Sequence, residues 1–391
     1  MAARSLARCA GDAADLFDEG RAVFVAPVNL LRLRGAFGMS GLAPGAFDQF
    51  RTFSPLSVLD GENGVQPNNP GNADLEPEKT QEIEGGFDLG MWGGRLSLEG
   101  TVYYSKTTDA ILPVPLPPSQ GFTVSRKANV GELQNKGWEA KFDVLPIEGD
   151  NFRWNSTVVM SGNKNKILEL GPSAECNEDR SECRLGGFRQ NVAMGARYNR
   201  TLVGYDAATN THTRSDTTEY IGDPLPSWEG SFINSFEFLN GFRLYFQFTW
   251  EKGAWFGNGD RPYQARQGAG DEYLSLIADD GTPTAAGDSL LDFFTLFGST
   301  DKRDNIRFGE VSLSYNIPAS FTGKLGLGPS SLTFSGQNLM WWDDCNCRDP
   351  NGSWRAGAES QTGEGNLNFG NSDFLSNPQP RRFVFTIRTA F

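Results

Sequence analysis

The sequence predicts an all-β fold, namely an antiparallel transmembrane β-barrel segment of about ten strands with long extracellular loops and short periplasmic turns. Two observations predict this class. Ten segments alternate between apolar and polar residues, as strands do when their two faces meet different media. Short and long connections also alternate along the chain, an asymmetry typical of outer-membrane barrels and uncommon in compact soluble domains. We assign this pattern to residues 28–391 and leave residues 1–27 unassigned.

The predicted strands are about ten residues long, which suits a tilted strand that crosses a bilayer. The clearest one covers residues 242–250, where the even positions are large and apolar and the odd positions include Arg243 and Gln247. Charged side chains inside a packed soluble core cost free energy unless they are paired, whereas a water-filled lumen accepts them. In chain order the ten segments are 30–39, 80–89, 95–105, 137–145, 152–162, 228–238, 242–250, 306–317, 331–339 and 381–391.

The connections between these segments fall into two length classes. Glycine pairs and Asn-Gly supply the positive φ that a tight hairpin requires. Short turns lie at 93–94, 146–151, 240–241 and 318–329, and the first and third of these carry such a pair. Long connections occupy 40–79, 106–136, 163–227, 251–305 and 340–380. All the short turns fall on the side where the chain ends, so we assign them to the periplasm and the long loops to the cell exterior.

The last segment has a face of large apolar residues that ends on a carboxyl-terminal Phe. These residues are Phe383, Phe385, Ile387 and Phe391, interrupted only by Thr389. The strand resembles the closing strand of bacterial outer-membrane barrels, whose terminal aromatic residue belongs to the signal read by the barrel-insertion machinery. The resemblance implies that these four residues form a membrane-insertion signal.

Composition and charge argue against several classes of function. The net charge of −13 leaves no basic stripe of the kind on which nucleic-acid binding depends. No stretch approaches the ~18 consecutive apolar residues of a membrane-spanning helix. The single histidine, His212, lies in a polar run and is expected to be an exposed loop residue, which argues against a His-based triad or zinc site. Without an isolated acid–base pair or a phosphate-binding loop, we predict neither an enzyme nor a cofactor site.

Four cysteines form two close pairs within the long connections. Cys176 lies near Cys183, and Cys345 lies near Cys347. At an oxidising cell surface such pairs are typical of disulfides that staple loops. Free thiols are a second interpretation. A metal site around residues 343–349 is a third, although no standard ligand spacing supports it.

Six short segments carry motifs that point to one family. Residues 31–41 read LRLRGAFGMSG and residues 72–80 read NADLEPEKT. They resemble the LKLRASYGxxG and NPDLKPEKT motifs of TonB-dependent receptors of the SusC/RagA type, with Ala73 in place of the usual Pro. Residues 135–139, 308–318 and 335–339 resemble that family's NKGxE, LRxLSLSYxLP and GRNL motifs, and Asp349-Pro350 follows where the family commonly has Asp-Pro. Each match alone is weak, but six in the family's order are specific.

The resemblance implies a barrel of about 22 strands around an amino-terminal plug domain. The matched region is expected to cover about half of such a barrel without the plug domain, and residues 1–27 show no resemblance to the family's motifs. An open half-barrel would leave two strand edges with unsatisfied N–H and C=O groups in hydrocarbon, which is costly. We therefore expect this chain to be a fragment that does not transport on its own.

The resemblance further implies import of oligomeric nutrients, glycans or peptides, across the outer membrane. The implied partners are a SusD-like surface lipoprotein, the TonB–ExbB–ExbD complex acting through the missing amino-terminal part, and the barrel-insertion machinery. Aromatic rings in loops suit the apolar faces of such ligands. For Trp341 and Trp342, which directly follow a strand, a belt at the membrane interface is the competing interpretation. The candidate ligand contacts are Trp255, Phe256, Tyr263, Trp341, Trp342 and Trp354.

Two alternative functions remain open at this point. A β-rich carbohydrate-binding module at the cell surface would keep the aromatic residues but bury the phenylalanine stripes in a sandwich core. A complete small barrel would act as a passive pore. Dependence on detergent separates a module from a barrel, and steady conductance in planar bilayers identifies a pore.

Overall fold

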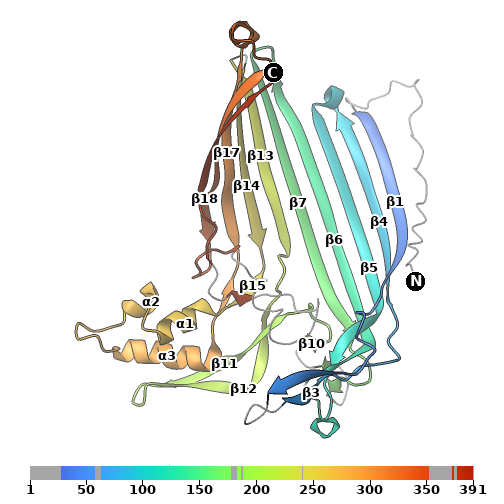
Figure 1. Cartoon of the computed structure of the whole chain (residues 1–391), viewed down its shortest axis with the longest axis vertical. Coiled ribbons are helices and arrows are strands. Elements are labelled where there is room, and N and C mark those ends of the chain that lie inside the picture. Colours follow the sequence, from blue (N-terminus) through green and yellow to red (C-terminus); the bar gives the residue numbers. More distant parts are fainter. Residues whose placement is uncertain are drawn as a thin grey trace.

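A ten-stranded sheet is the main element of the computed structural model (Figure 1). The structure describes residues 28–57, 63–122, 124–177, 183–185, 188–239, 241–351, 372–373 and 377–390. The strands of the sheet, in spatial order, are β1 (Val28–Leu42), β4 (Glu78–Met91), β5 (Leu96–Val114), β6 (Arg126–Glu148), β7 (Phe152–Glu169), β13 (Trp228–Phe238), β14 (Phe242–Lys252), β17 (Asn305–Ile317), β18 (Ser330–Asp343) and β20 (Arg382–Thr389).

The spatial order of these strands is also their order along the chain, and every neighbouring pair is antiparallel. This up-and-down arrangement is that of outer-membrane barrels, so the predicted fold class is confirmed. All ten predicted segments are found. The strands β5, β6 and β7 extend beyond their predicted limits toward the long loops, because β-bulges near Ala110 and Leu133 interrupt the two-residue period there.

The hydrogen-bond register places most of the large apolar residues of the sheet on one face. One row of directly paired residues crosses six strands from β7 to β20: Trp154, Phe236, Leu244, Leu313, Phe334 and Phe385. In the described part of the chain no second layer covers this row, and the side chain of Phe385 is 63% exposed. The stacked layers that a sandwich module requires are therefore not formed, and that alternative is wrong.

The opposite face of the sheet is polar and charged. Arg34 on β1 lies 3.0 Å from the carboxylate of Asp88 on β4. Lys141 on β6 lies 2.7 Å from Asp143 on the same strand and 3.6 Å from Glu99 on β5. These charged residues occupy the polar positions of the two-residue sequence pattern. Such a surface suits contact with a water-filled lumen, where exposed ions keep their hydration.

Aromatic residues mark both ends of the apolar face. At the long-loop end, Trp138 and Trp228 are both paired with Gly162, and Trp228 also packs against Trp250 at 6.1 Å between ring centroids. At the other end Phe242 stacks on Tyr315 at 4.4 Å. Ten residues of β13 separate the two rows, or ~25 Å along the membrane normal at the usual rise of ~3.3 Å and tilt of ~40°. That height matches the apolar band of a membrane barrel.

The two ends of the sheet differ as predicted (Figure 1). Tight connections lie at the end where the chain terminates, with positive φ at Gly93, Gly94 and Gly241. The short helix α4 (Ala319–Thr322) also lies in one of these turns. At the opposite end the long connections gather into a folded layer.

That layer corrects the expectation of plain long loops. It contains a set of short strands and three helices: β2 (Thr52–Ser57), β3 (Asn63–Asn69), β8 (Glu175–Cys176), β9 (Cys183–Leu185), β10 (Phe188–Arg189), β11 (Arg197–Asp206), β12 (Thr211–Gly222), β15 (Trp255–Asn258), α1 (Asp260–Arg266), α2 (Asp271–Leu274), α3 (Ala285–Phe297), β16 (Thr300–Lys302) and β19 (Ser372–Asp373). Most of these elements are too short to show a clear period. None of the helices in the described part is long and apolar enough to span a membrane.

The buried core of the protein lies mostly in this layer and not in the barrel wall. Leu112, Ile167 and Leu170 form one cluster at the extended ends of β5 and β7. Tyr273 and Phe294 belong to a second cluster between the helices. A wall one strand thick has no interior of its own, so apolar residues can be buried from solvent only where loops fold over each other.

Candidate functional site

The candidate site is a polar pocket in the folded layer beyond β14, β17 and β18. The strand β15 pairs with β16 on one side and with β19 on the other, and α1 begins directly after β15. The pocket has a volume of ≈ 380 Å³. Its lining includes Asp260, Arg261, Gln264, Glu272, Asn346 and Arg348.

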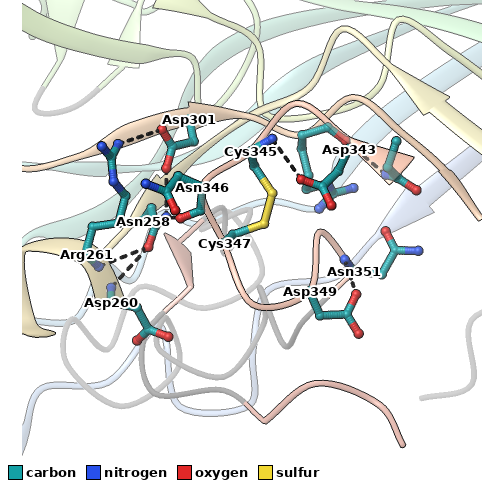
Figure 2. The surroundings of a disulfide bond; sticks show 12 residues. Asn258, Asp260, Arg261, Asp301, Asp343, Cys345, Asn346, Cys347, Asp349 and Asn351 are labelled. Carbon is teal, nitrogen blue, oxygen red and sulfur yellow. Dashed lines mark hydrogen bonds and ion pairs between the residues drawn. A yellow bond between two sulfur atoms is a disulfide. The ribbon is translucent and has the colours of Figure 1, made fainter. Parts of the chain in front are cut away.

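Asn258 connects the segments around the pocket and lies beside Asn346 and Arg261 (Figure 2). Its side chain is 1% exposed, and its amide nitrogen donates to Asp301 at 2.7 Å and to the carbonyl oxygen of Asn346 at 2.8 Å. Its amide oxygen accepts from the backbone N–H groups of Asp260 and Arg261 at 3.2 and 3.3 Å. Asn258 thus satisfies amide groups at the start of α1 and ties the 346 loop to the strand.

Arg261 supplies the main positive charge of the pocket. Its guanidinium donates to Glu272 at 2.7 and 2.9 Å and to Asp301 at 3.1 Å, and it lies 5.3 Å above the ring of Phe294. Burial disfavours the cation, but the carboxylates of Glu272 and Asp301 outweigh burial and raise the pKa of Arg261. The guanidinium is therefore charged and held in one position between the carboxylates of Glu272 and Asp301.

The predicted aromatic contacts of this region lie in different surroundings. Trp255 is half-buried and packs against the backbone of Gly222, where any added Cβ would come within 2.1 Å of the indole. Phe256 is 2% exposed, so its ring supports the layer from inside and is not presented to solution. Tyr263 on α1 is 40% exposed. Of the three, Tyr263 is the most exposed to solution.

The predicted aromatic pair at the end of β18 points to opposite sides. Trp342 pairs with Ile306 on the apolar face and is 50% exposed, as a residue of an interfacial belt would be. Trp341 pairs with Arg307 on the polar face, and the guanidinium lies 5.3 Å from its ring. Trp354 and the terminal Phe391 lie outside the described residues. Phe383, Phe385 and Ile387 share the apolar face of β20 and are 63–64% exposed.

The four loop cysteines form two disulfides in the structure. Cys176 and Cys183 join β8 to β9, and Cys345 is bonded to Cys347 beside the pocket (Figure 2). The side chain of Asp343 lies close to the second pair and accepts from the Cys345 N–H at 3.1 Å. Disulfide sulfurs are not thiolates, so these residues do not fit a metal ion in this state.

His212 contradicts the expectation of an exposed loop residue. Its side chain is 10% exposed, and its Nδ1 lies 2.8 Å from the carboxylate of Asp292 on α3. The rings of Tyr205 and Phe293 lie against it, and Ser289 is 3.4 Å from Nε2. The polar sequence around His212 gives no sign of its partner Asp292, which lies 80 residues away in the chain. We interpret the group as a clamp that fixes the β11–β12 hairpin on α3, because aromatic rings cover the imidazole.

A buried ion pair anchors the loop after β18. The sequence alone does not predict this pair. Arg307 on β17 donates to Asp349, and the two side chains are 8% and 1% exposed. Asp349 also accepts from the backbone N–H groups of Asn351 at 2.9 Å and Gln379 at 3.1 Å. The Asp349-Pro350 motif is therefore a structural anchor between the barrel wall and the loop layer.

Comparisons with known proteins agree with this architecture. The family model described as TonB dependent receptor-like, beta-barrel matches residues 20–339, and it begins inside the segment left unassigned above. TonB-dependent receptor P26 of Formosa agariphila is 28% identical over 92% of this chain and 40% of its own length. TonB-dependent receptor SusC of Bacteroides thetaiotaomicron is 29% identical over 38% of this chain and 16% of its own length.

A solved structure of the RagAB peptide transporter shares the fold. It superimposes with a TM-score of 0.73 over 94% of this chain and 42% of that chain, at 19% sequence identity. This chain spans 40% of the length of the curated relative P26. The family model covers most of the chain, and the resemblance to SusC/RagA-type receptors is confirmed. The chain therefore belongs to the TonB-dependent receptor family and forms part of its outer-membrane β-barrel.

Proposed function

We propose that the protein containing this chain imports oligomeric nutrients, glycans or peptides, across the outer membrane. The observation that carries the proposal is the polar, charged inner face of a wall whose other face is apolar. Such a wall can enclose an aqueous path through hydrocarbon. A nutrient too large for simple diffusion needs a path of this kind.

The folded layer at the long-loop end supports selective capture of a ligand. The pocket beside Asn258 combines the fixed cation Arg261 with the carboxylates of Asp260 and Glu272. The ring of Tyr263 is exposed on the same helix. Convergent hydrogen-bonding groups in the pocket, together with an exposed flat ring elsewhere on α1, suit either a sugar or a peptide. Trp255, Trp341 and Trp354 remain proposed contacts, to be tested individually.

Three partners complete the proposal. A SusD-like surface lipoprotein would dock on the long-loop end, where the folded layer offers a large outer surface. The TonB–ExbB–ExbD complex would supply energy through a region other than the residues described. The barrel-insertion machinery would recognise the apolar face of β20, including Phe383, Phe385 and Ile387.

Energy-dependent uptake tests this function directly. Cells that make the full-length protein and cells that lack its gene are given fluorescent oligosaccharides and oligopeptides, with and without a protonophore. The proposal predicts accumulation of one class only in cells that make the protein, and its loss on adding the protonophore. Uptake that is the same with and without the protonophore would support the passive pore instead. If cells that lack the gene take up as much ligand as cells that make the protein, both the import proposal and the passive pore would be contradicted.

The exposed aromatic residue of α1 has its own test within the same assay. Changing Tyr263 to Ala removes the exposed ring, and we expect uptake to fall through a weaker apparent affinity for the ligand, with the amount of protein in the membrane unchanged. Tyr205 is similarly exposed but packs on His212, so Tyr205→Ala, which also removes a whole ring, is the matched control. Equal effects of the two variants would argue against a ligand role for Tyr263.

A further inference from the structure

Three lysines form a cluster on the lipid-facing side of the sheet, just beyond the tryptophan belt. Lys136 on β6 is directly opposite Lys164 on β7, and Lys166 lies two residues further along β7. Residues two apart in a strand point to the same face, so Lys136 shares its face with Trp138. Lys164 likewise shares its face with Gly162, the partner of Trp138 and Trp228. The cluster therefore begins one row outside the belt.

The charges of this cluster are not compensated within the described residues. Like charges directly opposite each other in an antiparallel pair are destabilising. None of these three lysines has a carboxylate within 4.0 Å among the residues that the structure describes. Such a carboxylate is present for Lys79, Lys106, Lys127, Lys141, Lys252 and Lys302.

The lysines surround a cavity and do not simply extend from a flat surface. The cavity has a volume of ≈ 350 Å³ and is closed by residues 191–193 and by Tyr220 and Asp223. The Asp223 carboxylate is the one acidic group in the lining, and it already accepts the Tyr220 hydroxyl at 2.7 Å. Three cations therefore face one carboxylate, in a chain whose net charge is −13.

We propose that Lys136, Lys164 and Lys166 bind the phosphate groups of an outer-leaflet lipid head group. Tryptophan rings settle at the depth of the head groups, so the lysines one and two rows outside the belt lie at the level of lipid phosphates. An ammonium group binds phosphate well as a point charge, and a bound phosphate would relieve the repulsion between Lys136 and Lys164. The inference depends on the orientation of the sheet in the membrane and not on what the protein transports.

The test measures lipid binding to the full-length protein purified in detergent. Bisphosphorylated lipid A is titrated into the micelles and bound lipid is counted by native mass spectrometry. We expect Lys136→Gln/Lys164→Gln to bind this lipid roughly thirtyfold more weakly, the effect of two lysine charges beside a membrane surface. Lys324→Gln is the control, because Lys324 also lacks an ion-pair partner among the described residues but lies in a short turn. It should bind as the unchanged protein does.

A second measurement uses only the unchanged protein, so its result does not depend on whether the lysine variant folds. The unchanged protein is titrated with dephosphorylated lipid A, which should bind at least tenfold more weakly than the bisphosphorylated form. Equal binding of the two lipids would overturn the proposal. So would a loss of lipid affinity in Lys324→Gln as large as that in Lys136→Gln/Lys164→Gln. Displacement of the lipid by millimolar inorganic phosphate would identify a soluble-anion site and would also overturn the assignment to a lipid.

Discussion

Individual polar residues decide how the loop layer is attached to the barrel wall. Asn258 satisfies four groups from three segments, and Asp349 joins β17 to two stretches of the following loop. Both side chains are almost fully buried. Buried polar groups are stabilising only when their hydrogen bonds are made, so each of these residues fixes its surroundings in one arrangement.

Removing the Asp349 carboxylate should release the loop after β18. In Asp349→Ala the Arg307 cation stays buried without its partner, and two backbone N–H groups lose their acceptor. Breaking a buried pair in this way costs ~3–5 kcal/mol. We expect the free energy of local opening, measured by hydrogen exchange at the amides of Asn351 and Gln379, to fall by about that amount.

The neighbouring Asp344 provides the matched control for this prediction. Its side chain is exposed, so Asp344→Ala should change the same opening free energy by less than ~0.5 kcal/mol. If both variants lowered the opening free energy equally, the effect would come from the net charge of the segment. The role of Asp349 as an anchor of the loop would then be contradicted.

At the scale of elements, the sequence predicts the barrel strands far better than the loop layer. Segments 228–238 and 242–250 match β13 and most of β14 because nine or more residues keep a period of two with few exceptions, such as Ile233 and Asn234 in β13. Strands as short as β15 cannot show a period. The docking of β12 on α3 depends on contacts between residues some 80 positions apart, which no local pattern encodes.

The same limit applies to the candidate site. Trp255, Phe256 and Tyr263 were singled out as aromatic loop residues, but the sequence alone could not separate the buried ring of Phe256 from the exposed one of Tyr263. The polar groups that shape the pocket, Asn258 and Arg261, carry no motif. Their roles follow from the turn between β15 and α1, which the structure reveals.

The docking of the β11–β12 hairpin on α3 should weaken in acid. The backbone N–H of His212, and then its imidazole, lower the pKa of the Asp292 carboxyl below its ordinary 3.8. A lowered pKa means that the ionised carboxylate stabilises the folded state above pH 3.8, and that this contribution is lost as the pH falls through the lower, folded-state pKa. Hydrogen exchange of α3 amides should therefore speed up below pH 4, beyond the intrinsic change.

The Asp292→Asn variant is the control for this pH dependence. It removes the titrating group, so its hairpin should be looser at neutral pH and should show a smaller further change in acid. An unchanged acid response in Asp292→Asn would assign the effect to another carboxyl group and contradict the clamp.

At the scale of the whole molecule, one physical division organises the protein. Alternate residues of ten strands separate an apolar face, bounded by aromatic rows, from a charged face. The loops at one end build a folded layer with its own core. In the proposed function the apolar face meets lipid and the charged face lines an aqueous path. The import proposal and the proposed lipid-phosphate site both depend on this division.

Spin labels along β14 test the division most directly. Each residue from 242 to 252 is changed in turn to a labelled cysteine in the full-length protein in bilayers, and its accessibility to oxygen and to a water-soluble nickel complex is measured. Labels at even positions should be accessible to oxygen, and labels at odd positions to nickel, with a strict period of two. Labels at even positions that neither reagent reaches would mean that these rings are packed in a protein interior, which would contradict the account.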